Sequence, residues 1–218
     1  MKTSAKVIGL GLGVVTALAL STFTIRAQNL LSDPYFASGT IVANGFGGWN
    51  TFRDAQFSTT YTYGPTSYSM KDTGTGSYSF PGSYQYVPAS AGVSYLLTGY
   101  AYIPTALTGA SEGLLQVTFR DSALDNLGTV QTSPGNALLS TPLVTSSSPT
   151  GTWIELSEIA TAPANSVYIE PFTLVLDANP TTVYFDDLSL TVVPEPASFG
   201  MVAAVAAVVP FFLRRRQK

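Results

Sequence analysis

Carboxylates are the side chains of this sequence with the most potential for acid–base chemistry, because it contains neither histidine nor cysteine. Glu155 and Glu158 are three residues apart, and Asp186 and Asp187 are adjacent. Neither spacing sets two carboxylates on opposite strands across a cleft, as a glycosidase requires at a separation of about 5–10 Å. Serine catalysis lacks its histidine partner and thiolate metal sites are excluded. We therefore expect no enzymatic activity, and little change in stability between pH 6 and 8.

Aromatic side chains offer a second kind of chemistry, since sugar rings stack on the faces of Trp and Tyr. Trp49 follows two glycines, which favours a platform at a loop. Tyrosines also recur two residues apart, which places each pair on one side of a strand. These pairs are Tyr61 and Tyr63, Tyr84 and Tyr86, and Tyr100 and Tyr102. We take Trp49, Tyr100 and Tyr102 as candidate ligand-binding residues, with core packing for Trp49 and cross-strand packing for the tyrosines as the alternative.

The charges of the chain are segregated along its length. Residues 28–193 carry twelve carboxylates against only three cations, Arg53, Lys71 and Arg120, and therefore have a net charge of -9. The remaining cations are confined to the two ends of the chain. An acidic body repels phosphate backbones, so we expect no nucleic-acid partner.

The first 27 residues have the layout of a signal peptide. Lys2 and Lys6 precede the uncharged apolar run 7–20, and Ala27 supplies a small residue for cleavage. The run is shorter than the roughly 20 apolar residues that span a bilayer. We expect signal peptidase to cleave after Ala27 and the protein to be exported.

The last 25 residues, 194–218, carry three signals in order: a proline-rich triplet, an apolar run over 199–213, and a basic end. The apolar run is a marginal membrane span whose cations would stay in the cytoplasm. This end resembles the PEP-CTERM sorting signal through Pro194, Glu195, Pro196, Arg214, Arg215 and Arg216. The resemblance implies membrane association during transit, recognition by an exosortase-like processing enzyme, and delivery to the cell envelope, the cell surface or the extracellular matrix. A persistent tail anchor is the alternative.

The body, residues 28–193, is predicted to be a single all-β domain. Alternating apolar and polar residues indicate strands at 93–103 and 115–120, and weaker patterns indicate others. The weaker candidates are 55–62, 78–87, 152–159, 167–176 and 181–192, with a long loop over 128–151. This number of short strands favours a two-sheet antiparallel β-sandwich of the jelly-roll kind, flanked by a signal-peptide helix and a C-terminal hydrophobic helix.

Both ends of the body resemble the galactose-binding-like jelly rolls found in many carbohydrate-binding modules. The matching short segments are Asn29-Leu30 followed by a turn, Gly48-Trp49, and Asp186-Asp187 on the last strand. The resemblance implies a structural calcium ion held through Asp186, although Ala37 stands where an acidic ligand is expected. The alternative is that Asp186 is satisfied by hydrogen bonds or lies exposed at a strand end.

These observations predict an exported surface protein whose body binds polysaccharide or another matrix component. Two alternatives remain at this point. The first is a structural matrix protein that binds no small ligand, and the second, weaker one is an enzyme that acts on glycans.

Overall fold

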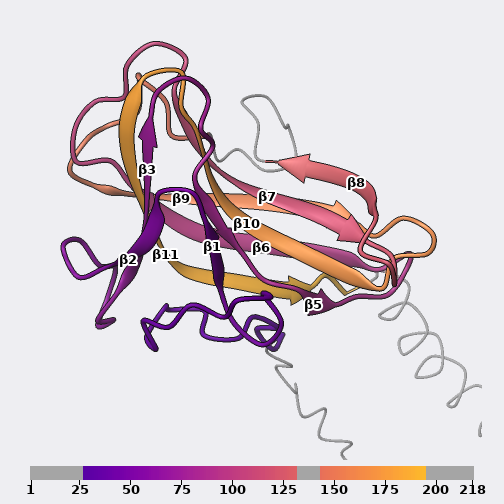
Figure 1. Ribbon diagram of the computed structural model, residues 1–218. Coiled ribbons are helices and arrows are strands. Elements are labelled where there is room, and N and C mark those ends of the chain that lie inside the picture. The colour runs from indigo at the N-terminus through magenta and orange to yellow at the C-terminus, as the bar shows by residue number, and fades with distance from the viewer. Residues whose placement is uncertain (1–26, 132–142, 195–218) are drawn as a thin grey trace, which may run out of the picture.

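The computed structural model describes residues 27–131 and 143–194, and this part of the chain forms a β-sandwich (Figure 1). The described residues contain strands and turns but no helix. The strands are β1 (Asn50–Phe52), β2 (Ala55–Ser58), β3 (Ser69–Thr75), β4 (Gly82–Tyr84), β5 (Val87–Pro88), β6 (Ser94–Tyr102), β7 (Glu112–Arg120), β8 (Asn126–Gln131), β9 (Trp153–Thr161), β10 (Tyr168–Leu176) and β11 (Pro180–Val192).

The strands form two antiparallel sheets. Sheet 1 has the order β1-β4-β10-β7-β8, with β5 paired to β10, and sheet 2 has the order β2-β3-β11-β6-β9. Apart from β7-β8 and β2-β3, neighbours in each sheet are not consecutive in sequence, as in a jelly roll. The predicted two-sheet antiparallel sandwich is confirmed.

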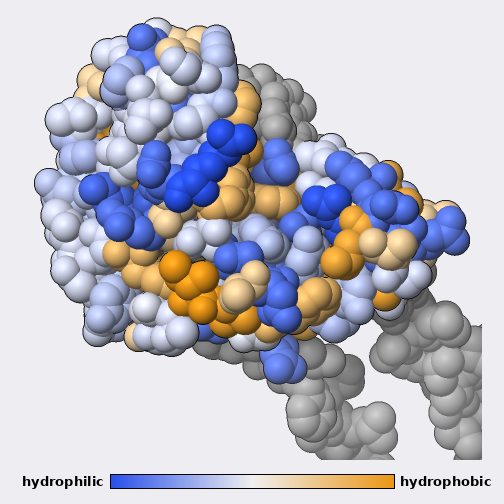
Figure 2. Space-filling view, viewed as in Figure 1, coloured by the Kyte–Doolittle hydropathy of each residue, from blue (hydrophilic) through white to orange (hydrophobic). Residues whose placement is uncertain are grey.

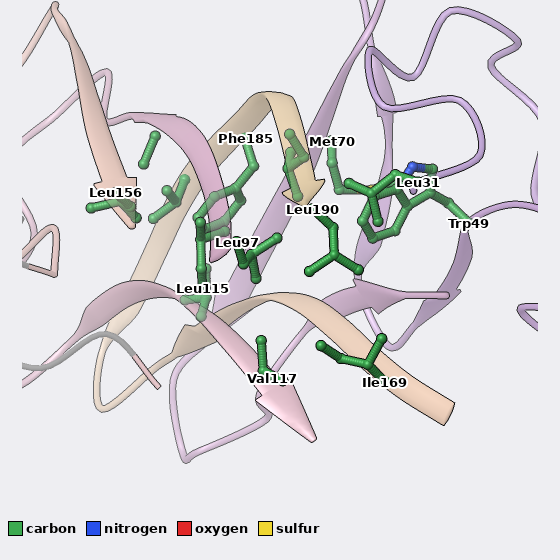
Figure 3. Close-up of a cluster of buried hydrophobic side chains, with 14 of the residues drawn as sticks. Leu31, Trp49, Met70, Leu97, Leu115, Val117, Leu156, Ile169, Phe185 and Leu190 are labelled. Carbon is green, nitrogen blue, oxygen red and sulfur yellow. The ribbon is translucent and has the colours of Figure 1, made fainter. Parts of the chain in front are cut away.

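The core lies between the two sheets and is built by alternation along the strands. In β6, Tyr95, Leu97 and Ala101 are buried, whereas the intervening residues are half-exposed. Figure 3 shows core residues from both sheets pointing toward one another, including Leu97 and Phe185 from sheet 2 and Leu115 and Ile169 from sheet 1. The apolar side chains of the alternating strands are thereby removed from water.

The start of the body is tied to its last strand. Asn29 donates through Nδ2 to the Leu188 carbonyl oxygen at 3.0 Å and accepts from the Leu190 backbone N at 3.0 Å. The Leu30 backbone N donates to the Leu190 carbonyl oxygen at 2.8 Å. One asparagine side chain therefore satisfies both a donor and an acceptor of the strand that closes the fold.

Seven strand regions were predicted, and each contains a strand of the structure. Three strands were missed: β1, β3 and β8. β3 contains two polar buried residues, Ser69 and Asp72, that obscure its alternation, and β8 extends into the predicted long loop 128–151. The two terminal helices fall outside the described residues, within which no helix is long and apolar enough to cross a membrane.

Candidate functional site

The outer face of sheet 1 is defined by the side chains that β10 turns away from the core. Ile169 and Thr173 point inward and are fully buried, whereas Tyr168, Glu170 and Phe172 point outward. A strand of period two places these three outward residues in one row.

Aromatic rings from neighbouring strands and one loop join this row, and we call the set the aromatic face. Phe46 packs against Tyr86 with ring centroids 4.7 Å apart and against Tyr168 at 5.4 Å. Tyr84 lies opposite Phe172 in the register of β4 and β10, with ring centroids 5.7 Å apart. The aromatic face comprises Phe46, Phe52, Tyr84, Tyr86, Tyr168 and Phe172. Figure 2 shows a hollow over β7 and β10, where hydrophobic and hydrophilic residues meet.

A charged pair lies beside these rings. Arg120 on β7 donates through Nε to Oε2 of Glu170 at 2.7 Å, and the Glu170 side chain is only 3% exposed. Burial raises the pKa of Glu170, although Arg120 and a hydrogen bond from Tyr86 act in the opposite direction. Burial and the nearby Glu170 charge raise the pKa of Tyr86 to about 12, so its hydroxyl stays protonated and donates to Glu170.

Amide and hydroxyl groups complete the polar part of this face. Asn50 donates through Nδ2 to the Tyr84 hydroxyl at 2.8 Å, which fixes the orientation of that ring. Gln116 lies opposite Phe172 on the neighbouring strand and is half-exposed. The surface therefore combines flat apolar rings with hydrogen-bonding groups, which is the chemistry that binds sugars.

The carboxylates on this face are too far apart for glycoside hydrolysis. Glu170 lies opposite Thr118, whereas Glu112 lies six residues away along β7. At about 3.4 Å per residue the two carboxylates are roughly 20 Å apart, well beyond the 5–10 Å of a glycosidase pair. This spacing does not match that of a glycosidase pair.

Trp49 does not form a platform, and this corrects the sequence-based prediction. The side chain is 1% exposed and packs in the core near Leu31 and Met70 (Figure 3). Its Nε1 donates to the Asp33 carbonyl oxygen at 2.9 Å, and its ring packs on Phe36 at 5.1 Å. Neither face of the indole is open to a ligand, so the core alternative holds.

Tyr100 and Tyr102 lie on the outer face of sheet 2, away from the aromatic face. The Tyr63 ring is stacked on Tyr100 with centroids 3.9 Å apart, and the Tyr61 ring is stacked on Tyr102 at 4.5 Å. A hydrogen bond with Tyr63 raises the pKa of Tyr100 to about 12. Each of these two predicted residues therefore already has one ring face occupied by a tyrosine from the segment between β2 and β3.

Asp186 is buried on β11. Its Oδ2 accepts from the Tyr63 backbone N at 2.8 Å and from the Thr66 hydroxyl at 2.9 Å, and its Oδ1 accepts from the Asp187 backbone N. Burial raises its pKa to about 6 despite these three bonds.

This arrangement does not fit a calcium ion. Calcium requires six to eight oxygen ligands, whereas the groups directed at the Asp186 carboxylate are hydrogen-bond donors. Within residues 27–131 and 143–194, no three Asp or Glu side chains gather closely enough to hold a metal ion. The geometry matches the alternative in which Asp186 is satisfied by hydrogen bonds.

The sorting residues from Glu195 onward lie outside the described residues, and Pro194 is the last described residue. Sequence reasoning noted the spacing of Tyr84 and Tyr86 but did not select them, and it missed the row on β10. The signal was present as the alternation of Tyr168, Glu170 and Phe172. The neighbouring Arg120 could not be paired with Glu170 without the strand register.

Comparisons with known proteins place the fold. No protein-family model matches the sequence, and no curated protein matches it either. Among solved structures, the CBM22-1 xylan-binding domain from Paenibacillus barcinonensis Xyn10C superposes with a TM-score of 0.54 at 18% identity. The match covers 78% of this chain and 97% of that domain. The body therefore has the same jelly-roll fold as this carbohydrate-binding module.

Two larger proteins contain a similar domain. The enzymatically active domain of bacteriophage CBA120 tailspike protein 4 matches with a TM-score of 0.54 at 11% identity, over 76% of this chain. An arabinose-bound MgGH51 α-L-arabinofuranosidase matches with a TM-score of 0.50 at 17% identity, over 75% of this chain. The match spans only 21% and 26% of those two chains, respectively.

Proposed function

We propose that the chain is an exported module without catalytic activity, and that its body binds polysaccharide through the aromatic face of sheet 1. The observation that carries this proposal is the combination of half-exposed rings with a protected Arg120–Glu170 pair on one sheet face. The fold shared with a module named as xylan-binding supports it.

The aromatic face favours an uncharged stretch of sugar chain. The positive charge of Arg120 and the negative charge of Glu170 offset each other at 2.7 Å, so the polar part of the face presents hydrogen-bonding atoms with little net charge. Phe46 is 40% exposed and extends the row of rings beyond Tyr86 and Tyr168. A sugar ring stacked there could also reach the Tyr86 hydroxyl and the half-exposed guanidinium of Arg120.

Delivery to the cell envelope or surface belongs to the same proposal. The apolar run after Lys6, and the Pro194-Glu195-Pro196 triplet followed by an apolar run and arginines, support export and exosortase-type processing. Intact mass of the protein from its host tests this part. A product that begins at Gln28 and ends near the triplet is expected, and a product that retains Arg214, Arg215 and Arg216 would contradict processing.

Binding is tested with the body, residues 28–193, by affinity electrophoresis in gels that contain neutral polysaccharides from a panel. The double variant Tyr84→Ala, Tyr168→Ala should lose retention, because two ring faces are removed from the aromatic face. Tyr102→Ala, which removes a similar ring from the outer face of sheet 2, is the matched control and should retain the wild-type migration.

Two results would overturn the binding proposal. One is a wild-type body that no polysaccharide in the panel retards, particularly if it self-associates with rising concentration, as a structural matrix protein would. The other is equal retention of the double variant and the wild type, when thermal melting shows that both proteins are folded.

A further inference from the structure

A pocket of about 390 Å³ lies on the outer face of sheet 2, at its β2 edge. Its lining comes from the turn before β2, from β2 itself and from alternate residues of β3: Arg53, Asp54, Ala55, Gln56, Lys71, Thr73 and Thr75. The volume falls in the range of small-ligand pockets, about 300–1,000 Å³. The pocket is on the opposite sheet from the aromatic face.

The pocket gathers the two cations of the body that are not committed elsewhere. Residues 28–193 contain three cations, and Arg120 is held by Glu170 on sheet 1. The other two, Arg53 and Lys71, both line the pocket, and neither forms an ion pair within the described residues. In a body with a net charge of -9, this concentration of positive charge in one hollow is a local reversal of sign.

Neutral hydrogen-bonding groups surround these cations. Gln56 lies directly opposite Lys71 in the pairing of β2 and β3, so the amide and the ammonium share one side of the sheet. Thr73 and Thr75 follow Lys71 on the same side of β3. The Thr73 hydroxyl has no hydrogen-bond partner in the described protein, and a change of its χ1 rotamer would turn it toward a ligand.

The backbone at Arg53 is held in an unusual conformation. Arg53 has a φ of +57°, in the left-handed region that non-glycine residues rarely adopt. The next residue is fixed, because the Asp54 carbonyl oxygen accepts from the Thr73 backbone N at 3.0 Å. The guanidinium is thus carried on a defined turn and not on a free loop, which lowers the entropy cost of binding a ligand.

We propose that this pocket binds the carboxylate of an acidic sugar, with Lys71 and Arg53 as its charged partners and Gln56 and Thr73 bonding to neighbouring hydroxyls. The Arg53 guanidinium can engage a carboxylate by two parallel hydrogen bonds. Asp54 in the lining and the net charge of the body disfavour a dense polyanion. The ligand is therefore a short uronic acid segment in a mainly neutral polysaccharide. The site goes beyond the aromatic face and does not depend on it.

The test uses the body and digalacturonic acid, with isothermal titration at low salt. Lys71→Gln and Arg53→Asn should each weaken binding roughly tenfold, as expected for the loss of one charge-assisted hydrogen bond. Asparagine is chosen at position 53 because it tolerates a positive φ, so the turn is retained. Thermal melting of each variant confirms that it is folded.

Two carboxylate variants separate a local site from the effect of net charge. Asp54→Asn removes a negative charge from the lining and should tighten binding severalfold. Glu155→Gln removes the same charge from an exposed position on β9, four strands from β2, and should leave binding unchanged. Equal effects of the two variants would overturn the proposal, because attraction would then be a property of the whole molecule.

Two further ligands test, by the same titration, whether the pocket recognises the carboxylate of the sugar. Fully methyl-esterified digalacturonate should not bind, and inorganic phosphate should compete only weakly. Binding of the ester, or binding of phosphate as tight as that of digalacturonate, would overturn the assignment to a uronic acid. The Tyr84→Ala, Tyr168→Ala variant should keep its affinity for digalacturonate, so failure at the aromatic face is distinguishable from failure here.

Discussion

Arg120 and Glu170 meet across β7 and β10 at 2.7 Å, and the burial of the two side chains is unequal: 23% of the Arg120 side chain is exposed, against 3% for Glu170. Because Glu170 is shielded from water, its charge depends on the arginine for stabilisation. The pair lies beside the rings of the aromatic face, and we expect the free energy of unfolding to fall more when the cation is lost than when the anion is lost.

Arg120→Met should lower the free energy of unfolding by about 3 kcal/mol at pH 8, because a buried carboxylate loses its partner. Glu170→Gln should cost less, since the amide oxygen still accepts from Arg120. The pKa of Glu170 is already raised by burial, and loss of Arg120 raises it further, so the cost of Arg120→Met should be smaller at pH 5 than at pH 8, because a larger fraction of the carboxyl is protonated at the lower pH. Urea unfolding at both pH values measures this. If Arg120→Met lowered the free energy of unfolding equally at pH 5 and pH 8, the unpaired Glu170 carboxylate would not be the cause of the destabilisation.

Asp72 is expected to make the protein less stable as pH rises toward neutrality. It is fully buried between the sheets, where Thr173 donates to its Oδ2 at 2.9 Å and its Oδ1 has no partner. Burial raises its pKa to about 7 from 3.8, although the Thr173 bond opposes the shift. The folded state then holds a proton that the unfolded state releases above pH 3.8, so stability is lost progressively as pH rises from about 4 to about 7, by on the order of 4 kcal/mol in total.

This prediction differs from the expectation that a chain without histidine changes little between pH 6 and 8. Chemical unfolding should show that the stability of the wild type declines from pH 4 to about pH 7 and then levels off. Asp72→Asn should remove most of this decline, leaving a smaller decline that ends near pH 6, where Asp186 finishes its titration. A wild-type curve that is flat from pH 4 to pH 8 would refute the assignment to Asp72.

The strands were predictable from sequence wherever one face of a strand meets the core and the other meets water. The alternation of Tyr95 and Leu97 with half-exposed neighbours is of this kind. β3 escaped detection because the buried Asp72 and Ser69 break the alternation with polar residues. Its place beside β11 follows from long-range pairing, which no local pattern contains.

The candidate sites were harder to predict, because spacing shows which residues share a side of a strand but not which side faces the core. The paired tyrosines were all found, yet Tyr100 and Tyr102 are covered by Tyr63 and Tyr61, whose segment folds back over sheet 2. The pocket at Lys71 requires the register that brings Gln56 opposite it. Composition alone did show that few cations remain in the body.

Trp49 should matter for stability and not for binding. Trp49→Phe removes the hydrogen bond from Nε1 to the Asp33 carbonyl oxygen and part of a fully buried ring. We expect a loss of about 1–3 kcal/mol in unfolding free energy, with polysaccharide retention unchanged under conditions where the protein is folded. Retention on an affinity gel and urea unfolding of the same preparation provide the measurement. If a folded Trp49→Phe variant lost retention on the gel, Trp49 would have to take part in polysaccharide binding, and this prediction would be wrong.

Asp186 is expected to hold the segment between β2 and β3 through hydrogen bonds, without a metal ion. Excess chelator should therefore leave the melting temperature unchanged, because no calcium is bound that could stabilise the folded state. Asp186→Asn should lower it, since the single amide oxygen cannot accept from all three donors that the two carboxylate oxygens serve, and about 1–3 kcal/mol is expected for a buried donor left without a partner.

The same variant should also change the fluorescence of Trp153. The Tyr63 ring packs edge-on against Trp153 with centroids 5.7 Å apart, so release of the segment exposes that indole, whereas Trp49 stays in the core. A red shift of the emission in folded Asp186→Asn is the expected sign. Thr66→Val, which removes one of the donors and keeps the carboxylate, should give a smaller shift in the same direction. The opposite outcome is a wild type whose melting temperature falls in chelator, together with an Asp186→Asn variant whose emission is not shifted. It would show that the Asp186 carboxylate binds a cation.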